Sequence, residues 1–311
     1  MKILVTGGAG FIGSHVVDLY LSEGHEVVIV DNLSTGRRIN LNPAAKFYEC
    51  DIRDKKLRQI FENEQPEIVN HHAAQADVRR SVAEPLYDAD VNLLGSLHLI
   101  ELARHYAAQK FIYSSSGGAV YGEPQYLPCD EDHPINPFCP YGATKHFVEH
   151  YLYMYEKIFN LPYIILRYPN VYGPRQDPNG EAGVIAIFIG KCLKGEPPTI
   201  NGDGEQLRDY VYVSDCARAN LLALDTDLPC GIYNLGSGRG TSVNQLFEIL
   251  QELTGRVVEA LSAPAKLGET RHIYLDAARA HRTLAWQPVV PLEQGLAETV
   301  SFIRKSESTL E

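Results

Sequence analysis

The chain has 311 residues, with 28 Lys or Arg against 39 Asp or Glu, and a formal net charge of −11 at pH 7. A chain of this length buries a large hydrophobic core, so it needs no disulfide or metal ion to hold its fold. The negative charge disfavours nucleic acid and anionic membranes as partners. The first apolar run is too short for a signal peptide or a membrane span, so we expect a soluble protein.

Six cysteines are spread along the chain without a Cys-x-x-Cys pair or the spacing of zinc ligands. We therefore expect reduced thiols, a cytoplasmic location and no metal site. The cysteines are Cys50, Cys129, Cys139, Cys192, Cys216 and Cys230.

Short apolar runs alternate with longer amphipathic stretches through the first half of the chain, which is typical of a parallel sheet with helices on both faces. We predict an α/β fold, a Rossmann-type doubly wound parallel sheet followed by a smaller C-terminal α/β substrate-binding lobe. In chain order, the predicted elements are a strand at Lys2–Thr6, a helix at Ile12–Glu23 ended by Gly24, strands at Val27–Val30, Phe47–Glu49 and Ile68–Asn70, a helix at Asn92–Ala107, a strand at Phe111–Ser114, a helix from Tyr141 to Phe159 and a strand at Tyr163–Leu166.

The character of the sequence changes past Pro169, where clusters of Gly and Pro interrupt shorter segments. We predict a first domain over residues 1–168 and a second over residues 169–311, with an approximate boundary that segments of the chain cross. Ligands of open parallel sheets bind outside the carboxyl ends of the strands, so we expect the site between the two domains.

A glycine triplet, Gly7-x-x-Gly10-x-x-Gly13, follows the first strand and opens the first helix. The first glycine permits a tight turn, the second lets backbone approach a pyrophosphate, and the third lets helix pack on strand. Asp31 lies about 20 residues further on, where an acid accepts hydrogen bonds from the adenosine ribose. Because Asp31 also repels a 2′-phosphate, the segment predicts NAD rather than NADP, although the basic pair Arg37-Arg38 lies nearby.

Two further strand ends carry polar side chains. Asp51 and Ile52 follow the third strand, where they are placed to meet the adenine ring, and a plain turn explains their spacing equally well. His71 and His72 stand together at the end of the fourth strand. Adjacent strand residues point to opposite faces and no third ligand is in view, so we place the two histidines in the core or the cofactor wall rather than at a metal.

Tyr141 and Lys145 lie four residues apart on one face of a predicted helix. A lysine so placed lowers the tyrosine pKa by charge proximity, and the phenolate then takes a proton from a sugar hydroxyl. The same spacing is common on solvated helix faces. The dinucleotide fingerprint upstream favours the catalytic interpretation.

The glycine segment, Asn92 on a helix, the segments 114–122 and 167–173, and the Tyr141/Lys145 pair together resemble the extended short-chain dehydrogenase/reductase superfamily. Within it, the chain is most similar to the UDP-glucose (UDP-galactose) 4-epimerase family, from Met1 to about Ile303. The resemblance implies an NAD site made of Gly7, Gly10, Phe11, Ile12, Gly13, Asp31, Asn32, Asp51, Ile52, His72, Ala73, Ala74, Gln75, Asn92, Tyr141 and Lys145.

The resemblance also implies a UDP-sugar site. Asn170 and Arg208 would hold the diphosphate, although Arg208 beside Asp209 fits a surface ion pair equally well. Lys266 and Glu269 stand where the family has Arg and Asp; both keep the charge sign, so we expect phosphate and ribose contacts from them. Lys cannot form a bidentate fork, which Arg271 would supply. Val184 is expected at an apolar wall near the sugar.

One position departs from the family pattern. Family members usually carry Ser or Thr three residues before the Val of Val-Tyr-Gly, and Gly117 stands there in this chain. Either Ser116 takes the role of hydrogen-bond partner for the reacting hydroxyl, or Tyr141 works with water and the substrate's own hydroxyls. We favour Ser116.

The reaction that the resemblance implies begins when Tyr141 takes the proton of the sugar 4-hydroxyl while the C4 hydride passes to NAD. The 4-keto sugar then turns over and the hydride returns to its opposite face. Related 4,6-dehydratases carry an Asp-Glu pair just before Val-Tyr-Gly, and related decarboxylases keep a Glu there. Gly118 and Ala119 lack these acid–base groups, which favours epimerisation.

Three alternatives remain open. Arg79 could meet the carboxylate of UDP-glucuronate, or belong to a solvated basic loop. Ile273 aligns with the position that controls the sugar pocket and is intermediate in bulk, which leaves UDP-N-acetylhexosamines open. A non-catalytic NAD-binding regulatory protein is permitted by Gly117, and the intact Tyr141 and Lys145 argue against it.

The helices predicted at Asn92–Ala107 and Ala143–Phe159 carry more apolar residues than one sheet face needs. The resemblance implies that they form the interface of a homodimer. The additional large side chains include Tyr151, Tyr153, Met154 and Tyr155.

Overall fold

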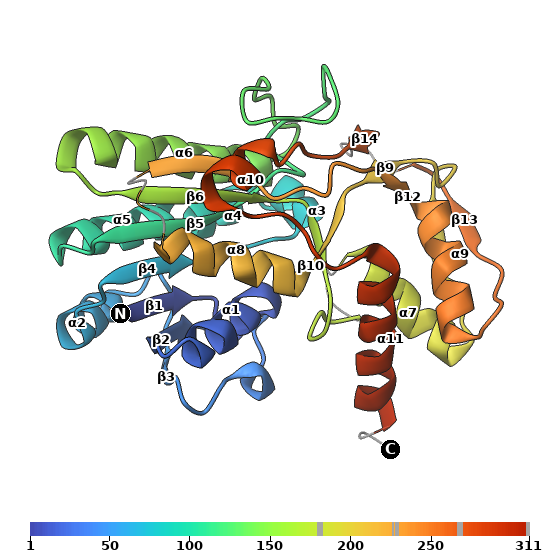
Figure 1. The fold of residues 1–311 in the computed structure, drawn as a ribbon, viewed down its shortest axis with the longest axis horizontal. Helices are drawn as coiled ribbons and strands as arrows, with labels where there is room; N and C mark the ends of the chain where they lie inside the picture. The colour runs from blue at the N-terminus through green and yellow to red at the C-terminus, as the bar shows by residue number, and fades with distance from the viewer. Residues whose placement is uncertain (179–182, 226, 228–229, 266–269, 309–311) are drawn as a thin grey trace.

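A seven-stranded sheet forms the centre of the molecule in the computed structural model, which describes residues 1–178, 183–225, 227, 230–265 and 270–308 (Figure 1). The strand order is β11-β6-β5-β4-β1-β2-β3, and every neighbouring pair is parallel. The strands are β1 (Lys2–Thr6), β2 (Glu26–Asp31), β3 (Lys46–Glu49), β4 (Ile68–His71), β5 (Lys110–Ser116), β6 (Tyr163–Tyr168) and β11 (Cys230–Asn234). The predicted parallel α/β sheet is confirmed, and its edge strand β11 was not predicted.

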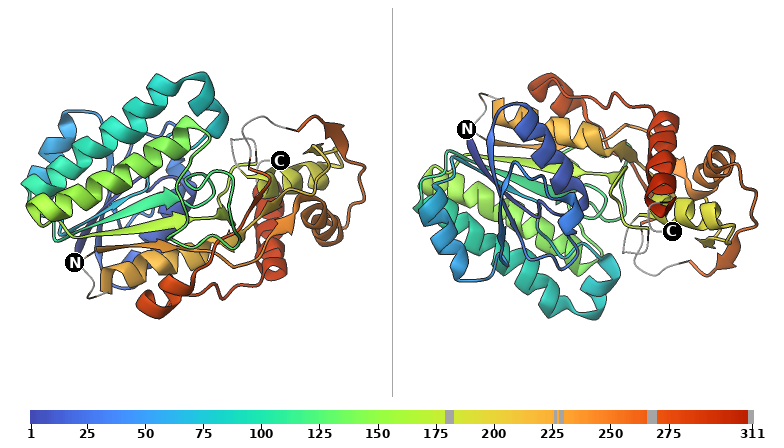
Figure 2. Two further views of the ribbon diagram at one scale, coloured as in Figure 1. Left: turned by 90° about the horizontal axis from the view of Figure 1, so that it is seen from above. Right: turned by 90° about the horizontal axis from the view of Figure 1, so that it is seen from below.

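Helices cover both faces because successive strand residues point to opposite sides and both sides are apolar. In β1, Ile3 and Val5 join the core under one helix layer, whereas Leu4 joins the core under the other. Figure 2 shows the helices on both sides of the sheet in two further views, from above and from below. The first layer is α1 (Phe11–Ser22), α8 (Val213–Asp225) and α10 (Ala278–Leu284), and the second is α2 (Lys56–Glu64), α5 (Gly95–His105) and α6 (Pro140–Phe159).

The helix predicted to begin at Asn92 begins earlier. The chain is helical from α4 (Pro85–Ala89) through the π-helical turn η2 (Asp90–Leu94) into α5. Pro85 stands in the first turn of α4, where its fixed φ and missing N–H suit a helix start. Asn92 therefore lies inside a π-helical turn instead of at a helix end. A short helix, α3 (Val78–Ala83), precedes α4.

A second group of elements forms the smaller lobe at one end of the sheet (Figure 1). Its helices share a hydrophobic core that includes Phe188, Phe247 and Leu296. The strands pair as β7 with β10, as β8 with β13, and as β12-β9-β14. The elements are β7 (Asn170–Tyr172), α7 (Val184–Lys194), β8 (Thr199–Asn201), β9 (Leu207–Arg208), β10 (Tyr210–Tyr212), β12 (Thr241–Ser242), α9 (Val243–Thr254), β13 (Leu261–Ala263), β14 (His272–Ile273) and α11 (Leu292–Ser308); a 3-10 turn, η1 (Arg38–Asn40), lies in the first half.

The second half of the chain returns to the large sheet. α8 packs against α1, and β11 pairs with β6 at the sheet edge. Segments beyond residue 168 therefore cross back, as expected for an approximate boundary: α8 and α10 join the first helix layer, and β11 joins the sheet. No helix in the described ranges is both long and apolar enough to cross a bilayer.

The strand order reverses between β1 and β4, so the carboxyl ends of these strands open a crevice at one edge of the sheet. The segments that follow β1, β2, β4, β5 and β6 meet at this edge. The loop after β7 is tied to the same place, because the carbonyl of Pro174 lies 2.9 Å from His15 Nε2 and Arg175 pairs with Asp18 at 2.6 Å.

A buried ion pair joins α6 to β6 behind this edge. Arg167 donates from Nε and Nη2 to the two carboxylate oxygens of Glu149 at 2.9 and 2.6 Å, and both residues are 2% exposed. Ser115 adds a third hydrogen bond to Glu149 at 2.6 Å. Burial alone raises the pKa of Glu149, but the hydrogen bonds from Arg167 and His146 bring that pKa down to about 2.

We expect Arg167→Met to lower the free energy of unfolding by about 3–5 kcal/mol, because it leaves the Glu149 carboxylate buried without its guanidinium. Urea unfolding at pH 7 measures the loss. The control is Lys191→Met, which breaks an exposed pair with Glu196 and should change stability by less than about 1 kcal/mol. Equal losses of unfolding free energy in the two variants would show that the buried ion pair contributes no more to stability than the exposed pair.

Candidate active site

The glycine segment forms a turn that has no room for a side chain at Gly7 or Gly13. Gly7 has φ +69°, and a Cβ there would lie 2.7 Å from the backbone nitrogen of Ala73. A Cβ on Gly13 would lie 2.3 Å from the carbonyl oxygen of Gly7. α1 begins at Phe11 after Gly10, with no side-chain cap on its first N–H groups. This helix start therefore offers open N–H donors to an anion such as a pyrophosphate.

Asp31 ends β2 directly beside that turn. Its carboxylate accepts hydrogen bonds from the backbone N–H of Ala9 at 3.0 Å and of Leu33 at 2.8 Å. Burial raises the pKa of Asp31, and these two hydrogen bonds oppose the shift. The acid predicted to meet the adenosine ribose is thus fixed against the glycine turn.

Asp51 links the ends of β2 and β3. It accepts hydrogen bonds from Asn32 and from Arg53 Nε and Nη2, each at 2.8 Å. The hydrogen bonds from Arg53 hold the pKa of Asp51 well below its usual range. Ile52 is buried beneath helix α5, where a Cβ on Gly95 would lie 2.7 Å from it. The segment is a turn, as its spacing allowed, and its side chains cross-link the ends of β2 and β3.

His71 and His72 face opposite ways, as predicted. The ring of His71 lies between Thr6 and Ser96, with nitrogen to hydroxyl distances of 2.7 and 2.8 Å. His72 lies 2.7 Å from the Ser114 hydroxyl and stacks on Tyr168. Burial and the charge of Lys145 lower the pKa of His72 to about 3, so its ring is neutral at pH 7. Within the described residues, no group of three or more potential ligands could hold a metal.

Asn92 holds the loop that follows β4. Its side chain accepts from the backbone N–H of Gln75 at 2.8 Å and donates to the carbonyl of Gln75 at 2.9 Å. Ala73, two residues earlier, donates its N–H to the Thr6 hydroxyl at 3.2 Å. The loop from His72 through Ala73 and Ala74 to Gln75 is thus held by hydrogen bonds from its backbone to the side chains of Asn92 and Thr6.

The α6 helix presents Tyr141 and Lys145 to the same edge. Lys145 is 4% exposed and donates from Nζ to the carbonyl of Ser114 at 2.8 Å, with Nζ 5.9 Å from the centre of the Tyr141 ring. Burial lowers the pKa of Lys145 to about 8, and the carboxylates of Asp88 and Glu149 oppose this shift. The buried ammonium and the phenol are brought together as the spacing predicted.

The geometry at the end of β5 explains the glycine that replaces the expected Ser or Thr. A Cβ on Gly117 would lie 2.4 Å from the side chain of Leu275, which is fully buried. Ser116 approaches Tyr141 instead; burial raises the pKa of Tyr141, and the hydrogen bond with Ser116 opposes that shift. A Cβ on Gly118 would lie 3.9 Å from both Ser116 Oγ and Asn170 Oδ1, so these two polar groups flank one space.

The predicted sugar-nucleotide residues lie in the smaller lobe. Asn170 begins β7, and Arg208 in β9 donates to the carbonyls of Leu207 and Arg271 at 2.9 and 3.3 Å. Val184 begins α7, partly buried against the core of the lobe. Lys266 and Glu269 lie outside the described residues.

Four other positions discussed from the sequence have the following surroundings in the structure. Arg271 directs its guanidinium fork to Asp203 at 2.8 and 2.7 Å. Asp209, beside Arg208, is 2% exposed and accepts from Ser237 and Leu275, a buried arrangement unlike a surface ion pair. Arg79 is exposed beside Asp77, and Ile273 is buried with Val120 and Leu275.

Sequence reasoning missed Asp88 and Thr144. Asp88 is fully buried and accepts hydrogen bonds from Gln75, Asn92 and Thr144 at 2.8 to 3.0 Å. Asp88 stands close to Glu84, Pro85 and Asp90 in the sequence, a pattern typical of an exposed helix. Its burial and these hydrogen bonds show that the carboxylate faces inward.

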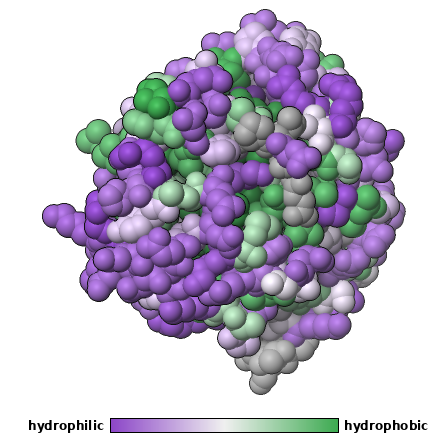
Figure 3. All heavy atoms as spheres, turned by 60° about the vertical axis from the view of Figure 1, so that its left-hand side comes forward, coloured by the Kyte–Doolittle hydropathy of each residue, from purple (hydrophilic) through white to green (hydrophobic). Residues whose placement is uncertain are grey.

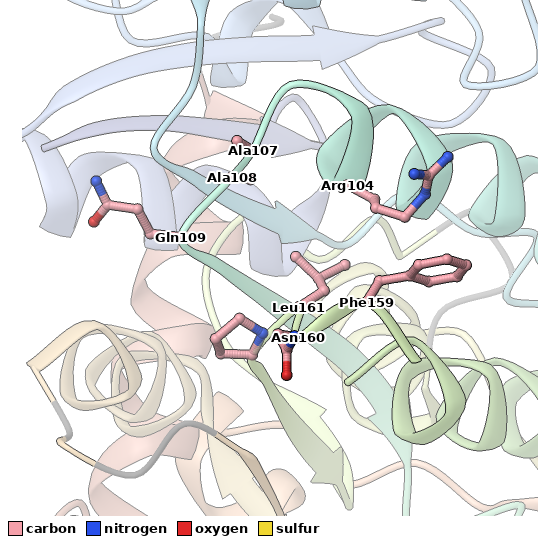
Figure 4. A pocket seen from close by; sticks show the side chains of 8 residues that line it. Arg104, Ala107, Ala108, Gln109, Phe159, Asn160 and Leu161 are labelled. Atoms are coloured by element: carbon pink, nitrogen blue, oxygen red, sulfur yellow. The ribbon is translucent and has the colours of Figure 1, made fainter. Parts of the chain in front are cut away.

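The opposite edge of the sheet, where β5 and β6 begin, has a pocket without acid–base side chains. Figure 3 shows small groups of hydrophobic side chains among hydrophilic ones on that side. A shallow pocket opens there between the segment 107–109 and the segment 159–162, with the Arg104 side chain at its rim (Figure 4). No carboxylate, histidine or tyrosine lines it, so the candidate chemistry lies at the carboxyl edge.

Comparison with known proteins decides the family. Residues 3–236 match the model described as the NAD dependent epimerase/dehydratase family. The chain belongs to this family. The predicted resemblance and the NAD cofactor are thereby confirmed, and the glycine turn, the open start of α1 and Asp31 provide a fitting site for NAD.

Three relatives match over nearly their whole length. A UDP-glucose 4-epimerase from Mycolicibacterium smegmatis is 44% identical, over 98% of this chain and 99% of its own. The crystal structure of UDP-glucose 4-epimerase from Thermotoga maritima with UDP-glucose is 51% identical, with a TM-score of 0.97 and full coverage of both chains. The Thermus thermophilus UDP-glucose 4-epimerase complex with NAD is 43% identical, with a TM-score of 0.94 over 98% of this chain and 99% of that one.

We expect Gly117→Ala to lower the free energy of unfolding by about 1–3 kcal/mol, because the new methyl group would overlap Leu275. Urea unfolding measures the change. Gly118→Ala is the matched control, since its Cβ meets nothing closer than 3.9 Å. Adding Leu275→Ala should make the cost of Gly117→Ala disappear, and an unchanged cost in that background would contradict the overlap.

Proposed function

We propose that this chain is an NAD-dependent UDP-glucose 4-epimerase, which interconverts UDP-glucose and UDP-galactose through a transient 4-keto sugar. One observation carries the proposal: the buried Lys145 ammonium, held on the Ser114 carbonyl, lies beside Tyr141 at the edge where the glycine turn and Asp31 form the dinucleotide site. The full-length relatives that bear this name support the same substrate.

In this proposal, Tyr141, Lys145 and Ser116 have different roles in proton transfer. Tyr141 takes the proton from the sugar 4-hydroxyl and returns it after the sugar has turned. The positive charge of Lys145 favours the phenolate form of Tyr141, which burial alone disfavours. Ser116 forms a hydrogen bond with Tyr141 and orients the reacting sugar hydroxyl. When bound, NAD supplies the two-electron oxidation and the later reduction at C4.

The grip on the substrate is divided between charged and apolar groups. Asn170 and Arg208 are suited to the diphosphate, since an amide and a guanidinium fork both match phosphate oxygens. Val184 offers an apolar surface near the sugar. Such an arrangement holds the nucleotide tightly and leaves the hexose room to turn.

Epimerisation fits this site better than elimination or decarboxylation. Gly118 and Ala119 stand where the related enzymes carry carboxylates, and the space at Gly118 is flanked by a hydroxyl and an amide instead. Arg79 is poorly suited to bind a sugar carboxylate, because its guanidinium lies 3.7 Å from Asp77 and its side chain is exposed.

The cytoplasmic location stays a prediction. All six cysteines are free thiols.

The test is to incubate the purified protein with UDP-glucose, UDP-glucuronate and UDP-N-acetylglucosamine separately and to follow the C4 epimer by NMR. We expect UDP-galactose from the first, without stoichiometric addition of NAD, because the cofactor is regenerated in each cycle. Tyr141→Phe should lower the rate by about 10²–10⁴-fold and still bind NAD, since only the proton acceptor is lost. Turnover confined to another UDP-sugar, or full activity in Tyr141→Phe, would refute the proposal.

We also propose that two copies of the chain pair through the outer faces of α4, η2 and α6. Large hydrophobic side chains are exposed there, with Leu86 at 86%, Leu94 at 57% and Phe147 at 54%. α4 and η2 both contact α6, so these side chains belong to one helical layer, which Figure 2 shows on the outside of the sheet. Of the side chains predicted for this role, Tyr153 is 47% exposed, whereas Tyr155 bonds to Glu101 and is partly buried.

We expect the combined change Leu86→Glu and Phe147→Glu to convert a dimer into a monomer, because it places unpaired carboxylates in an apolar interface. Light scattering after size exclusion measures the mass. Val257→Glu is the control: Val257 is 93% exposed in the smaller lobe, and its replacement should leave the dimer intact. A monomeric unmodified protein would contradict the proposed pairing.

A further inference from the structure

Asp88 is a buried carboxylate whose position no reaction step has yet explained. It lies on α4 with 0% of its surface exposed. Its three hydrogen-bond donors come from three places: Gln75 in the loop after β4, Asn92 in η2 and Thr144 in α6. Thr144 stands between Tyr141 and Lys145 in the sequence. Asp88 therefore connects the turn that carries the acid–base pair to the loop and the asparagine that wall the cofactor site.

The orientation of the two amides is fixed by backbone contacts. Gln75 accepts the N–H of Asp77 with Oε1 at 2.7 Å, so its Nε2 is the atom that donates to Asp88 at 3.0 Å. Asn92 accepts the N–H of Gln75 with Oδ1, so its Nδ2 donates to Asp88 at 2.9 Å. Both contacts require an acceptor at position 88, which a carboxylate supplies with each oxygen.

The hydrogen bonds to Asp88 that the structure shows come from neutral groups, so these donors do not neutralise a negative charge on its carboxylate. Glu149, the other carboxylate near Lys145, is already matched by Arg167 at 2.9 and 2.6 Å. Asp88 is the stronger of the two carboxylates that favour the charged form of Lys145. Tyr141 is the proposed acid–base group itself. The other titratable groups around these residues are uncharged at pH 7, since burial lowers the pKa of His71 and His72 and raises the pKa of Tyr113 and Cys139.

We propose that Asp88 is a positioning residue for the acid–base pair: its carboxylate ties α6 to the cofactor wall and supplies the buried negative charge that keeps Lys145 an ammonium ion. This inference rests on the proposed function for its catalytic consequence, whereas the coupling between Asp88 and Lys145 is a property of the folded protein itself. The two parts can therefore be tested separately.

Asp88→Asn is the informative variant, because it removes the charge and can keep the contacts. The amide oxygen of the new side chain can still accept from Gln75 and Asn92. Its NH₂ group would then face Thr144, whose hydroxyl also lies 3.0 Å from the carbonyl of Tyr141 and can turn to donate there. Thr144→Val is the complementary variant, which removes the tie to α6 and keeps the charge.

The first experiment needs no turnover. Urea unfolding of the purified protein is compared between pH 6 and pH 9.5 for the unmodified chain, Asp88→Asn, Lys145→Met and the double variant. The attraction between Asp88 and Lys145 exists only while folded Lys145 is protonated, that is, below about pH 8. The destabilisation by Asp88→Asn should therefore be largest at pH 6, shrink at pH 9.5, and show no such pH dependence in the Lys145→Met background.

The second experiment is the pH profile of the epimerisation rate. The rate falls at high pH when Lys145 loses its proton, so Asp88→Asn should move this alkaline limb to lower pH by about one pH unit or more. Thr144→Val should lower kcat and leave the limb in place. A limb that stays fixed in Asp88→Asn, or a destabilisation that is the same at both pH values, would overturn the proposal. If no epimerisation is found, the proposed function fails and the unfolding cycle still decides the coupling.

Discussion

The structure depends on one demanding constraint, a positive charge placed where water cannot reach it. Lys145 lies on the inner face of α6 and is held by the Ser114 carbonyl at the end of β5. Every neighbour is arranged around that ammonium: Asp88 and Glu149 oppose its deprotonation, and His71 and His72 remain neutral beside it. A buried ammonium near a phenol is costly to build, and its place at the carboxyl ends of the strands fits the proton transfer that we propose for Tyr141.

The polar groups around this charge also hold the loop that follows β4. Asn92 clamps the backbone of Gln75 from both sides, and Asp88 clamps Asn92. Since Gln75, Asp88, Asn92 and Thr144 are all hydrogen-bonded, the network favours a single arrangement of α4, α6 and the loop that follows β4. Such preorganisation matters for proton transfer, where the reacting atoms must be held within a fraction of an ångström.

The parts of the fold that follow local rules could be predicted. Most of the six strands from Lys2–Thr6 to Tyr163–Tyr168 contain apolar runs, and the glycine turn and Asp31 follow a spacing typical of dinucleotide sites. β11 could not be predicted, because its pairing with β6 depends on a return of the chain after the smaller lobe. Asp88 and Leu275 were missed for a similar reason: a buried carboxylate and a side chain that fills the space at Gly117 are recognised only from contacts distant in sequence.

The late position of β11 and α8 has a consequence for how the protein is made. α8 covers the helix that starts at the glycine turn, and β11 completes the sheet edge. Until residue 234 has left the ribosome, the first 168 residues have an open strand edge and an uncovered apolar helix face. The dinucleotide half taken alone therefore lacks both the strand that completes its sheet edge and the helix that covers α1.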